Sequence, residues 1–208
     1  MIKNIRLLLI LTLFTFVFTN NVQVDVIEQN EEYVIINYVI SDVIINEIIY
    51  NNEVYHDVNL KDEPNFIIKD SPKLPHVNRS LIIPELDFSM NVSIQNYEYK
   101  VYNDLNIIPS KGNPPRSIDI NSIPYKKGDV YLENKNFPGD LFQLYDPYVL
   151  RDFRGQVLQF NPVQYNPITK DLTVYNNMSI KIEFDEENNN NELLYSRNTD
   201  TIVKNYYN

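Results

Sequence analysis

The sequence predicts an all-β protein, built as an antiparallel β-sandwich of jelly-roll-like outline. Apolar residues alternate with polar ones along short segments rich in Val, Ile and Tyr, which is the pattern of half-buried strands. These segments recur roughly every ten residues and are separated by Asn, Asp and Pro, as in sandwiches and barrels. No long amphipathic helical pattern competes with them, so a βαβ architecture is not expected.

The first element, residues 1–19, has the composition of a secretory signal peptide. Lys3 and Arg6 precede an apolar and threonine run that ends at Thr19, and this run is shorter than the roughly 20 apolar residues of a membrane span. We expect cleavage near Thr19, export to the periplasm or medium, and no stable membrane insertion afterwards; a retained anchor is the alternative. Loss of Lys3 and Arg6 takes the formal net charge from −10 to −12.

The next element, residues 20–184, is the expected sandwich domain. Its strands are predicted where β-branched and aromatic residues alternate with polar ones. In chain order they are Val24–Ile27, Tyr33–Ile40, Val43–Ile49, Val54–Leu60, Leu81–Ile83, Phe88–Ile94, Tyr97–Tyr102, Leu105–Ile108, Gln156–Phe160, Leu172–Tyr175 and Ser179–Phe184.

Between these strands, the stretch from Pro109 to Pro147 predicts a long but ordered excursion. Proline fixes its own φ and restricts the preceding residue, so a proline-rich segment is stiff. Further along, Tyr165, Asn166 and Pro167 form an aromatic-Asx-Pro sequence that signals a turn. The sequence RDFRG at 151–155 predicts a corner, in which Arg151 and Asp152 anchor the chain and Gly155 relieves the turn before a strand. Arg154 belongs to the same motif.

The last elements follow the final strand. Residues 185–192, DEENNNNE, are a polar low-complexity run that we interpret as a linker. Residues 193–208 contain Leu, Ile, Val and Tyr side chains, and we expect either a short docking helix or a tail that a partner orders. This tail would lead towards a further domain.

The composition excludes several classes of function. The chain contains no cysteine, so it cannot supply a thiolate nucleophile, and we expect no catalytic residues. His56 and Asp57 are neighbours in a predicted strand and point to opposite faces, so His56 is expected to be a partly exposed strand residue rather than a metal ligand. His76 receives the same interpretation. We expect no cofactor or metal, and the acidic charge argues against nucleic acid as a partner.

One proline-rich loop carries a candidate binding residue, Arg116. The residues expected to shape this loop are Lys111, Gly112, Pro114, Pro115 and Ser117. An extended, stiff segment loses little conformational entropy on binding, and a guanidinium is the natural partner of a carboxylate in a protease pocket. From the residues alone, a solvated surface arginine is the competing interpretation.

Residues 146–184, DPYVLRDFRGQVLQFNPVQYNPITKDLTVYNNMSIKIEF, resemble the closing half of the N-terminal propeptide of gingipain-type cysteine peptidases. The likeness extends to Ser71–Pro84, Asn106–Gly112, Ser122–Tyr131 and Asn136–Asp140, and it covers residues 22–208. RDFRGQ and QYNPITKDLTVY are its most specific parts.

The resemblance implies an all-β domain that packs on a peptidase catalytic domain, in cis or in trans, assists its folding and keeps it latent. It also implies that Arg116, which follows SKG at the family's interval, enters the specificity pocket of the peptidase. No catalytic domain follows Asn208 in this sequence, and the nearest basic residue to its end is Lys204. The chain is therefore expected to be either part of a larger preproprotein or a free-standing inhibitor. The alternative function is a secreted module that binds carbohydrate or protein through its many tyrosines.

Overall fold

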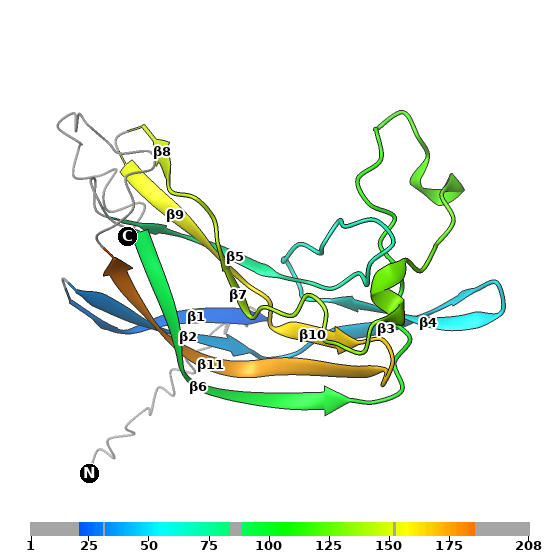
Figure 1. Ribbon diagram of the computed structural model, residues 1–208, viewed down its shortest axis with the longest axis horizontal. Coiled ribbons are helices and arrows are strands. Elements are labelled where there is room, and N and C mark those ends of the chain that lie inside the picture. Colours follow the sequence, from blue (N-terminus) through cyan, green and yellow to red (C-terminus); the bar gives the residue numbers. More distant parts are fainter. Residues whose placement is uncertain (1–20, 31, 84–88, 152, 186–208) are drawn as a thin grey trace, which may run out of the picture.

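The computed structural model describes residues 21–30, 32–83, 89–151 and 153–185. It confirms the predicted antiparallel β-sandwich (Figure 1). The elements are β1 (Val22–Gln29), β2 (Tyr33–Ile40), β3 (Ile44–Tyr50), β4 (Glu53–Asn59), β5 (Val77–Ile82), β6 (Ser89–Tyr102), the short 3₁₀ helices η1 (Ile120–Ser122) and η2 (Asp129–Leu132), β7 (Phe142–Leu144), β8 (Tyr148–Leu150), β9 (Phe153–Phe160), β10 (Val163–Asn166) and β11 (Asp171–Asp185).

Two sheets and a separate hairpin make up the described part of the chain. The first sheet has the order β1-β2-β11-β10, with β6 paired to the other edge of β11. The second has the order β5-β9-β7, and β8 also pairs with β9. Strands β3 and β4 form a hairpin that extends beyond the sheets at one end of the molecule (Figure 1). All strand pairs are antiparallel. One face of β2 in the first sheet is buried and the other is half-buried, whereas β9 in the second sheet has buried residues on both faces.

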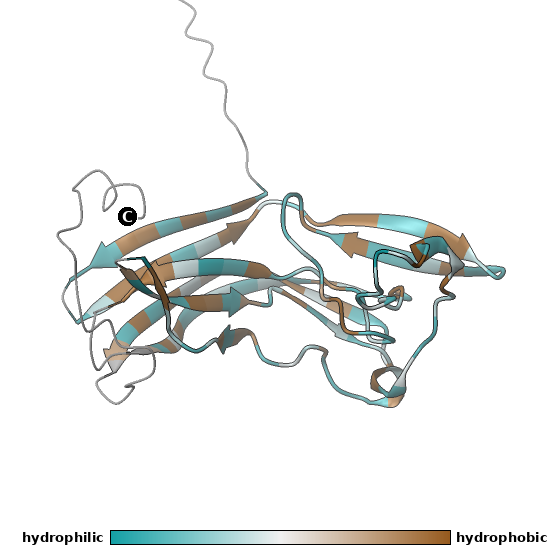
Figure 2. Ribbon diagram, turned by 90° about the horizontal axis from the view of Figure 1, so that it is seen from above, coloured by the Kyte–Doolittle hydropathy of each residue, from teal (hydrophilic) through white to brown (hydrophobic). Residues whose placement is uncertain are grey.

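The core lies between the two sheets, and period-two alternation places its residues. In β2, every second residue is buried, from Val34 to Ile40, and Figure 2 shows the same alternation of hydrophobic and hydrophilic residues along the strands. Tyr38 of β2 lies 4.9 Å from Phe160 of β9, measured between ring centroids, and Phe142 of β7 stacks on Phe160 at the same distance. Phe160 is fully buried, and a phenylalanine side chain in this position contributes about 1.5–3 kcal/mol.

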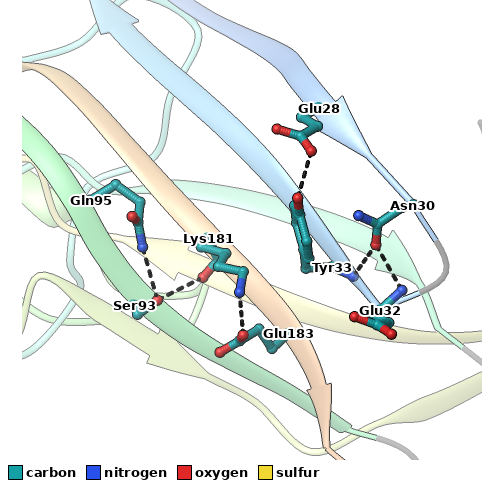
Figure 3. Close-up of polar contacts among 8 residues, drawn as sticks. All are labelled: Glu28, Asn30, Glu32, Tyr33, Ser93, Gln95, Lys181 and Glu183. Atoms are coloured by element: carbon teal, nitrogen blue, oxygen red, sulfur yellow. Dashed lines mark hydrogen bonds and ion pairs between the residues drawn. The ribbon is translucent and has the colours of Figure 1, made fainter.

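Polar side chains make several contacts on the first sheet (Figure 3). The hydroxyl of Tyr33 donates to Glu28 across the β1–β2 pair, and the side chain of Asn30 accepts the backbone N–H groups of Glu32 and Tyr33 at 2.9 Å. Asn30 therefore closes the β1–β2 turn as an Asx residue does. In the same sheet, the ammonium group of Lys181 pairs with Glu183.

Four predicted strands are in fact two long ones. Strand β6 unites Phe88–Ile94 with Tyr97–Tyr102, and β11 unites Leu172–Tyr175 with Ser179–Phe184. The polar residues between them are accommodated by shifts of register in the β6–β11 pair, so they do not end the strands.

Other strand predictions were wrong or incomplete. Residues Leu105–Ile108 do not form a strand; instead, Ile107 makes an isolated parallel bridge to His56 and is fully buried. Strands β7, β8 and β10 were not predicted, because each is only three or four residues long and has too few alternations to detect.

Several predicted segments lie outside the described residues. These are the signal peptide (1–19), the linker (185–192) apart from Asp185, the docking tail (193–208), and Asp152 of the predicted corner. Among the described residues, no helix is long and apolar enough to cross a membrane.

Candidate functional site

The candidate site is the Arg116 loop, which we define as residues 111–127. It projects from the body of the domain on the side opposite β6 (Figure 1). Its two ends meet at Asp70 and Ser71. The N–H of Ser110 donates to the carbonyl of Ser71 at 2.8 Å, the N–H of Asp70 donates to the carbonyl of Ser110 at 2.9 Å, and the N–H of Gly128 donates to the carbonyl of Asp70 at 2.8 Å. The loop is therefore closed at its base by backbone hydrogen bonds.

Gly112 lets the loop leave this base. Its φ is +77°, in the left-handed region, and its N–H donates to the hydroxyl of Ser110 at 3.1 Å. A Cβ atom at this position would lie 2.9 Å from the Cβ of Lys69. Glycine is thus required at position 112 both for its backbone conformation and for the close approach of Lys69.

Lys111 joins the two limbs of the loop. Its Nζ donates to the carbonyl of Ile120 at 2.9 Å and lies 4.2 Å from the centre of the Tyr125 ring. The Tyr125 ring in turn meets Tyr50 of β3 edge-on, with 5.1 Å between ring centroids. These contacts attach the loop to itself and to the β3–β4 hairpin, so its tip is held in a defined position.

Arg116 lies at this tip. The N–H of Ile118 donates to the carbonyl of Pro115 at 3.0 Å, which closes a four-residue turn with Arg116 and Ser117 at its centre. Both central residues are exposed, as is Pro115, whereas Pro114 is half-buried. Among the residues that the structure describes, Arg116 has no hydrogen-bond or ion-pair partner, so its guanidinium group is available to a partner molecule.

A pocket of ≈ 240 Å³ lies at the root of the loop. Its apolar lining comes from Phe66, Ile67, Pro109, Ile120 and Tyr125. The pocket therefore lies between two parts of the chain: the segment that contains Phe66 and Ile67, and the limb of the loop that contains Ile120 and Tyr125.

The second candidate motif, RDFRG, lies at the opposite end of the molecule and is structural. Arg151 is exposed in the β8–β9 turn with φ of +56°, and Arg154 is fully buried in β9. The prediction that Gly155 relieves a turn is wrong, because Gly155 lies inside β9, paired with Ile82 and Tyr148. A Cβ at Gly155 would lie 2.8 Å from the Tyr148 ring, so glycine is needed there for close packing between strands.

The third motif, Tyr165-Asn166-Pro167, ends strand β10 and begins the β10–β11 connection. The Tyr165 side chain is buried, and its hydroxyl donates to the carbonyl of Leu105 at 2.8 Å. The side chain of Asn166 accepts the N–H groups of Ile168 and Thr169, as in an Asx turn. Pro167 is buried. None of these residues is near the Arg116 loop in the chain or contributes to its hydrogen bonds.

The histidines do not assemble a metal site. The Nδ1 atom of His56, in β4, accepts the N–H of Asn106 at 3.0 Å. His76 packs on Phe66, and burial lowers the pKa of its imidazole. Among the described residues, no group of three His, Cys, Asp or Glu side chains is placed to hold a metal ion.

Sequence reasoning missed the residues that support the loop from outside it. Asp70, Ser71 and Lys69 are about 40 residues from the loop in the sequence, and no local pattern connects them to it. Tyr125 and Lys127 carry a weak signal, since a basic residue near an aromatic one favours a cation–π contact. The observed partners are distant in the sequence, however: Lys127 lies 5.0 Å from the Tyr55 ring and donates to Asn106 at 2.9 Å, and the Tyr125 ring meets Lys111.

Residues 16–205 match the protein family described as Propeptide_C25. Gingipain R2 of Porphyromonas gingivalis is 38% identical over 141 residues, which are 68% of this chain and 18% of that protein. Gingipain R1 of the same organism is 39% identical over 129 residues, which are 62% of this chain and 13% of that protein. The chain therefore spans less than a fifth of the length of these relatives.

Two solved structures share the fold. A chain in the complex of Porphyromonas gingivalis RgpB pro- and mature domains superposes with a TM-score of 0.80 at 30% identity, covering 90% of this chain and 95% of that chain. A structure that addresses the zymogenic latency of gingipain K superposes with a TM-score of 0.68 at 18% identity, covering 81% and 95%. The second likeness shows a common fold.

Proposed function

The chain belongs to the Propeptide_C25 family, and from this premise we propose that it is the inhibitory and folding-assisting propeptide of an exported gingipain-like cysteine endopeptidase. The domain itself is not the peptidase, and it contains no cysteine. Its partner is the catalytic domain of such an enzyme, in cis or in trans, by analogy with the solved complex of RgpB pro- and mature domains.

The observation that carries this proposal is the free guanidinium of Arg116 at the tip of a tethered loop. Lys111 and Gly112 hold the loop before a partner arrives, so little conformational entropy remains to be lost on binding. A guanidinium fits a carboxylate bidentately, and such a pair is strong in a pocket that excludes water. Arg116 thus fills the specificity pocket of a peptidase that cleaves after basic residues.

The turn at Arg116 accounts for inhibition rather than cleavage. A peptidase aligns the scissile carbonyl with its nucleophile, and a displacement of about 1 Å lowers the rate roughly a hundredfold. In this loop, the Arg116–Ser117 bond is the central bond of a closed turn, because the N–H of Ile118 bonds to the carbonyl of Pro115. The chain folds back after Arg116 and does not continue along the cleft.

The remaining segments fit the same role. Residues 1–19 would direct export, residues 20–184 form the inhibitory domain, residues 185–192 act as a linker, and residues 193–208 lead towards the catalytic domain. The export proposal is supported by the composition of the first segment and by the family.

A binding module is the second candidate function, and one observation favours it. Tyr97 and Tyr99 of β6 are about half exposed and contact Tyr175 of β11, with ring centroids 5.6 and 5.7 Å away. Aromatic rings of this kind pack on the apolar faces of sugars or on protein side chains. Inhibition of a peptidase would separate the two candidates.

The test is a titration of residues 20–208 into an arginine-specific gingipain-type catalytic domain. The rate at which the enzyme hydrolyses a small arginine substrate is measured at each concentration. We expect tight inhibition by the wild type, a loss of affinity of about a hundredfold for Arg116→Ala, and a smaller loss for Arg116→Lys. Arg151→Ala is the matched control, because Arg151 is an exposed turn arginine far from the loop. Equal inhibition by Arg116→Ala would move the contact elsewhere, and no inhibition by any variant would favour the binding module.

A further inference from the structure

Four exposed isoleucines lie on the Arg116 loop and on the segment that packs against its base. Ile67 and Ile68 come from the segment before β5, and Ile118 and Ile120 come from the loop; their exposed fractions are 61%, 51%, 47% and 47%. A single exposed isoleucine is ordinary on a protein surface. Four of them on two segments that approach one functional loop indicate an apolar contact surface, which we call the isoleucine collar.

The two segments of the collar are fixed relative to each other. Ile67 and Ile120 both line the pocket at the root of the loop. Lys111 holds the carbonyl of Ile120, and Gly112 packs against Lys69, the residue that follows Ile68. The collar is therefore formed before binding and is continuous with the tip that carries Arg116.

Charge indicates what covers this surface. Residues 111–127 contain Lys111, Arg116, Lys126 and Lys127 but only one acidic residue, Asp119. The loop is thus locally basic in a chain whose formal net charge is −10. A complementary partner has an acidic recess surrounded by apolar surface.

We infer that the isoleucine collar packs against an apolar rim around the substrate cleft of the cysteine peptidase and seals the pocket that Arg116 enters. This inference rests on the proposed function. Contacts that surround a buried arginine exclude water from it and so strengthen its charged hydrogen bonds, even where they contribute little themselves. The collar acts mainly on dissociation, and the basic residues of the loop act on association.

The test uses the full chain with Arg116 intact. The double variant Ile67→Asn/Ile120→Asn is compared with Ile168→Asn, an isoleucine of similar exposure in the β10–β11 connection. Inhibition constants and association and dissociation rates are measured against the same catalytic domain, and thermal unfolding checks that all variants remain folded. We expect the double variant to dissociate at least about tenfold faster and the control to match the wild type.

The outcomes separate the two claims. If the double variant inhibits as the wild type does while Arg116→Ala has lost inhibition, the collar is not a contact surface and the proposed function stands. If the wild type does not inhibit, the proposed function and the collar are both wrong. If Ile168→Asn weakens inhibition as much as the double variant, the effect is not specific to the collar and the inference is overturned.

Discussion

At the scale of single residues, one hydrogen bond closes the turn that, in the proposed function, protects the Arg116–Ser117 bond from cleavage. The N–H of Ile118 closes the turn around Arg116 and Ser117. Proline has no N–H, and it also disfavours the α conformation of the residue before it, so proline at position 118 opens the turn in two ways. The apolar character of the side chain is retained.

We therefore predict that Ile118→Pro converts the loop from an inhibitor into a substrate. After incubation with an arginine-specific gingipain-type catalytic domain, mass spectrometry is expected to find cleavage after Arg116 in this variant and an intact loop in the wild type. Ile118→Val, which keeps the N–H, is the control and should stay intact. An uncleaved Ile118→Pro variant that still inhibits would mean that something other than the turn protects the bond.

At the scale of elements, Gly155 sets how closely β8 packs on β9. An added Cβ would lie 2.8 Å from the Tyr148 ring and 3.3 Å from the carbonyl oxygen of Leu81. The first contact is with the end of a side chain, but the carbonyl belongs to the backbone of β5, the neighbouring strand. We predict that Gly155→Ala lowers the free energy of unfolding by about 1–3 kcal/mol through overpacking.

Urea unfolding of the wild type and of Gly155→Ala measures this effect. The double variant Gly155→Ala/Tyr148→Leu removes the ring tip and should recover part of the loss, which shows that the two positions are coupled. Inhibition by the folded fraction should be unchanged, because the Arg116 loop lies elsewhere. If Gly155→Ala and the wild type are equally stable, β8 and β9 can move apart to accept the added methyl group without loss of stability, and the prediction is wrong.

The elements were also the level at which prediction from the sequence succeeded best. Alternation located β2 at its observed bounds, Tyr33–Ile40, because one face of that strand is buried throughout. It divided β6 and β11, because a register shift places polar residues inside a continuous strand. The RDFRG motif led to the wrong prediction that Gly155 relieves a turn, because the Tyr148 ring that requires a glycine belongs to another strand. Non-local contacts of this kind leave no local pattern.

At the scale of the whole molecule, the position of the Arg116 loop could not be predicted from composition. Proline content predicted a stiff excursion, but the backbone bonds from Ser110 and Gly128 to Asp70 and Ser71 determine where it leaves the body. The resemblance to a propeptide family selected Arg116 among the exposed basic residues. The structure adds a loop that is tethered at its base and attached to the β3–β4 hairpin through Tyr125.

This arrangement would separate the two activities of the proposed function. Inhibition would depend mainly on the tip of one loop, whereas assistance to folding would depend on any surface that binds the native catalytic domain and not its unfolded chain. Such binding stabilises the native state by RT ln(1 + [L]/Kd), about 2.7 kcal/mol at a hundredfold excess over Kd. Removing the Arg116 side chain weakens the complex but leaves the sandwich and the collar in place.

We therefore predict that Arg116→Ala still raises the yield of refolded catalytic domain when it is supplied in trans at a concentration well above its weakened Kd. The catalytic domain is diluted from denaturant with wild type, with Arg116→Ala, or with an unrelated acidic β-sandwich as a control, and activity is measured after dilution to dissociate the complexes. Both propeptide forms should raise the yield above the control. A yield for Arg116→Ala that only equals the control would mean that the loop tip is also needed for folding, and the two activities would then reside in one contact.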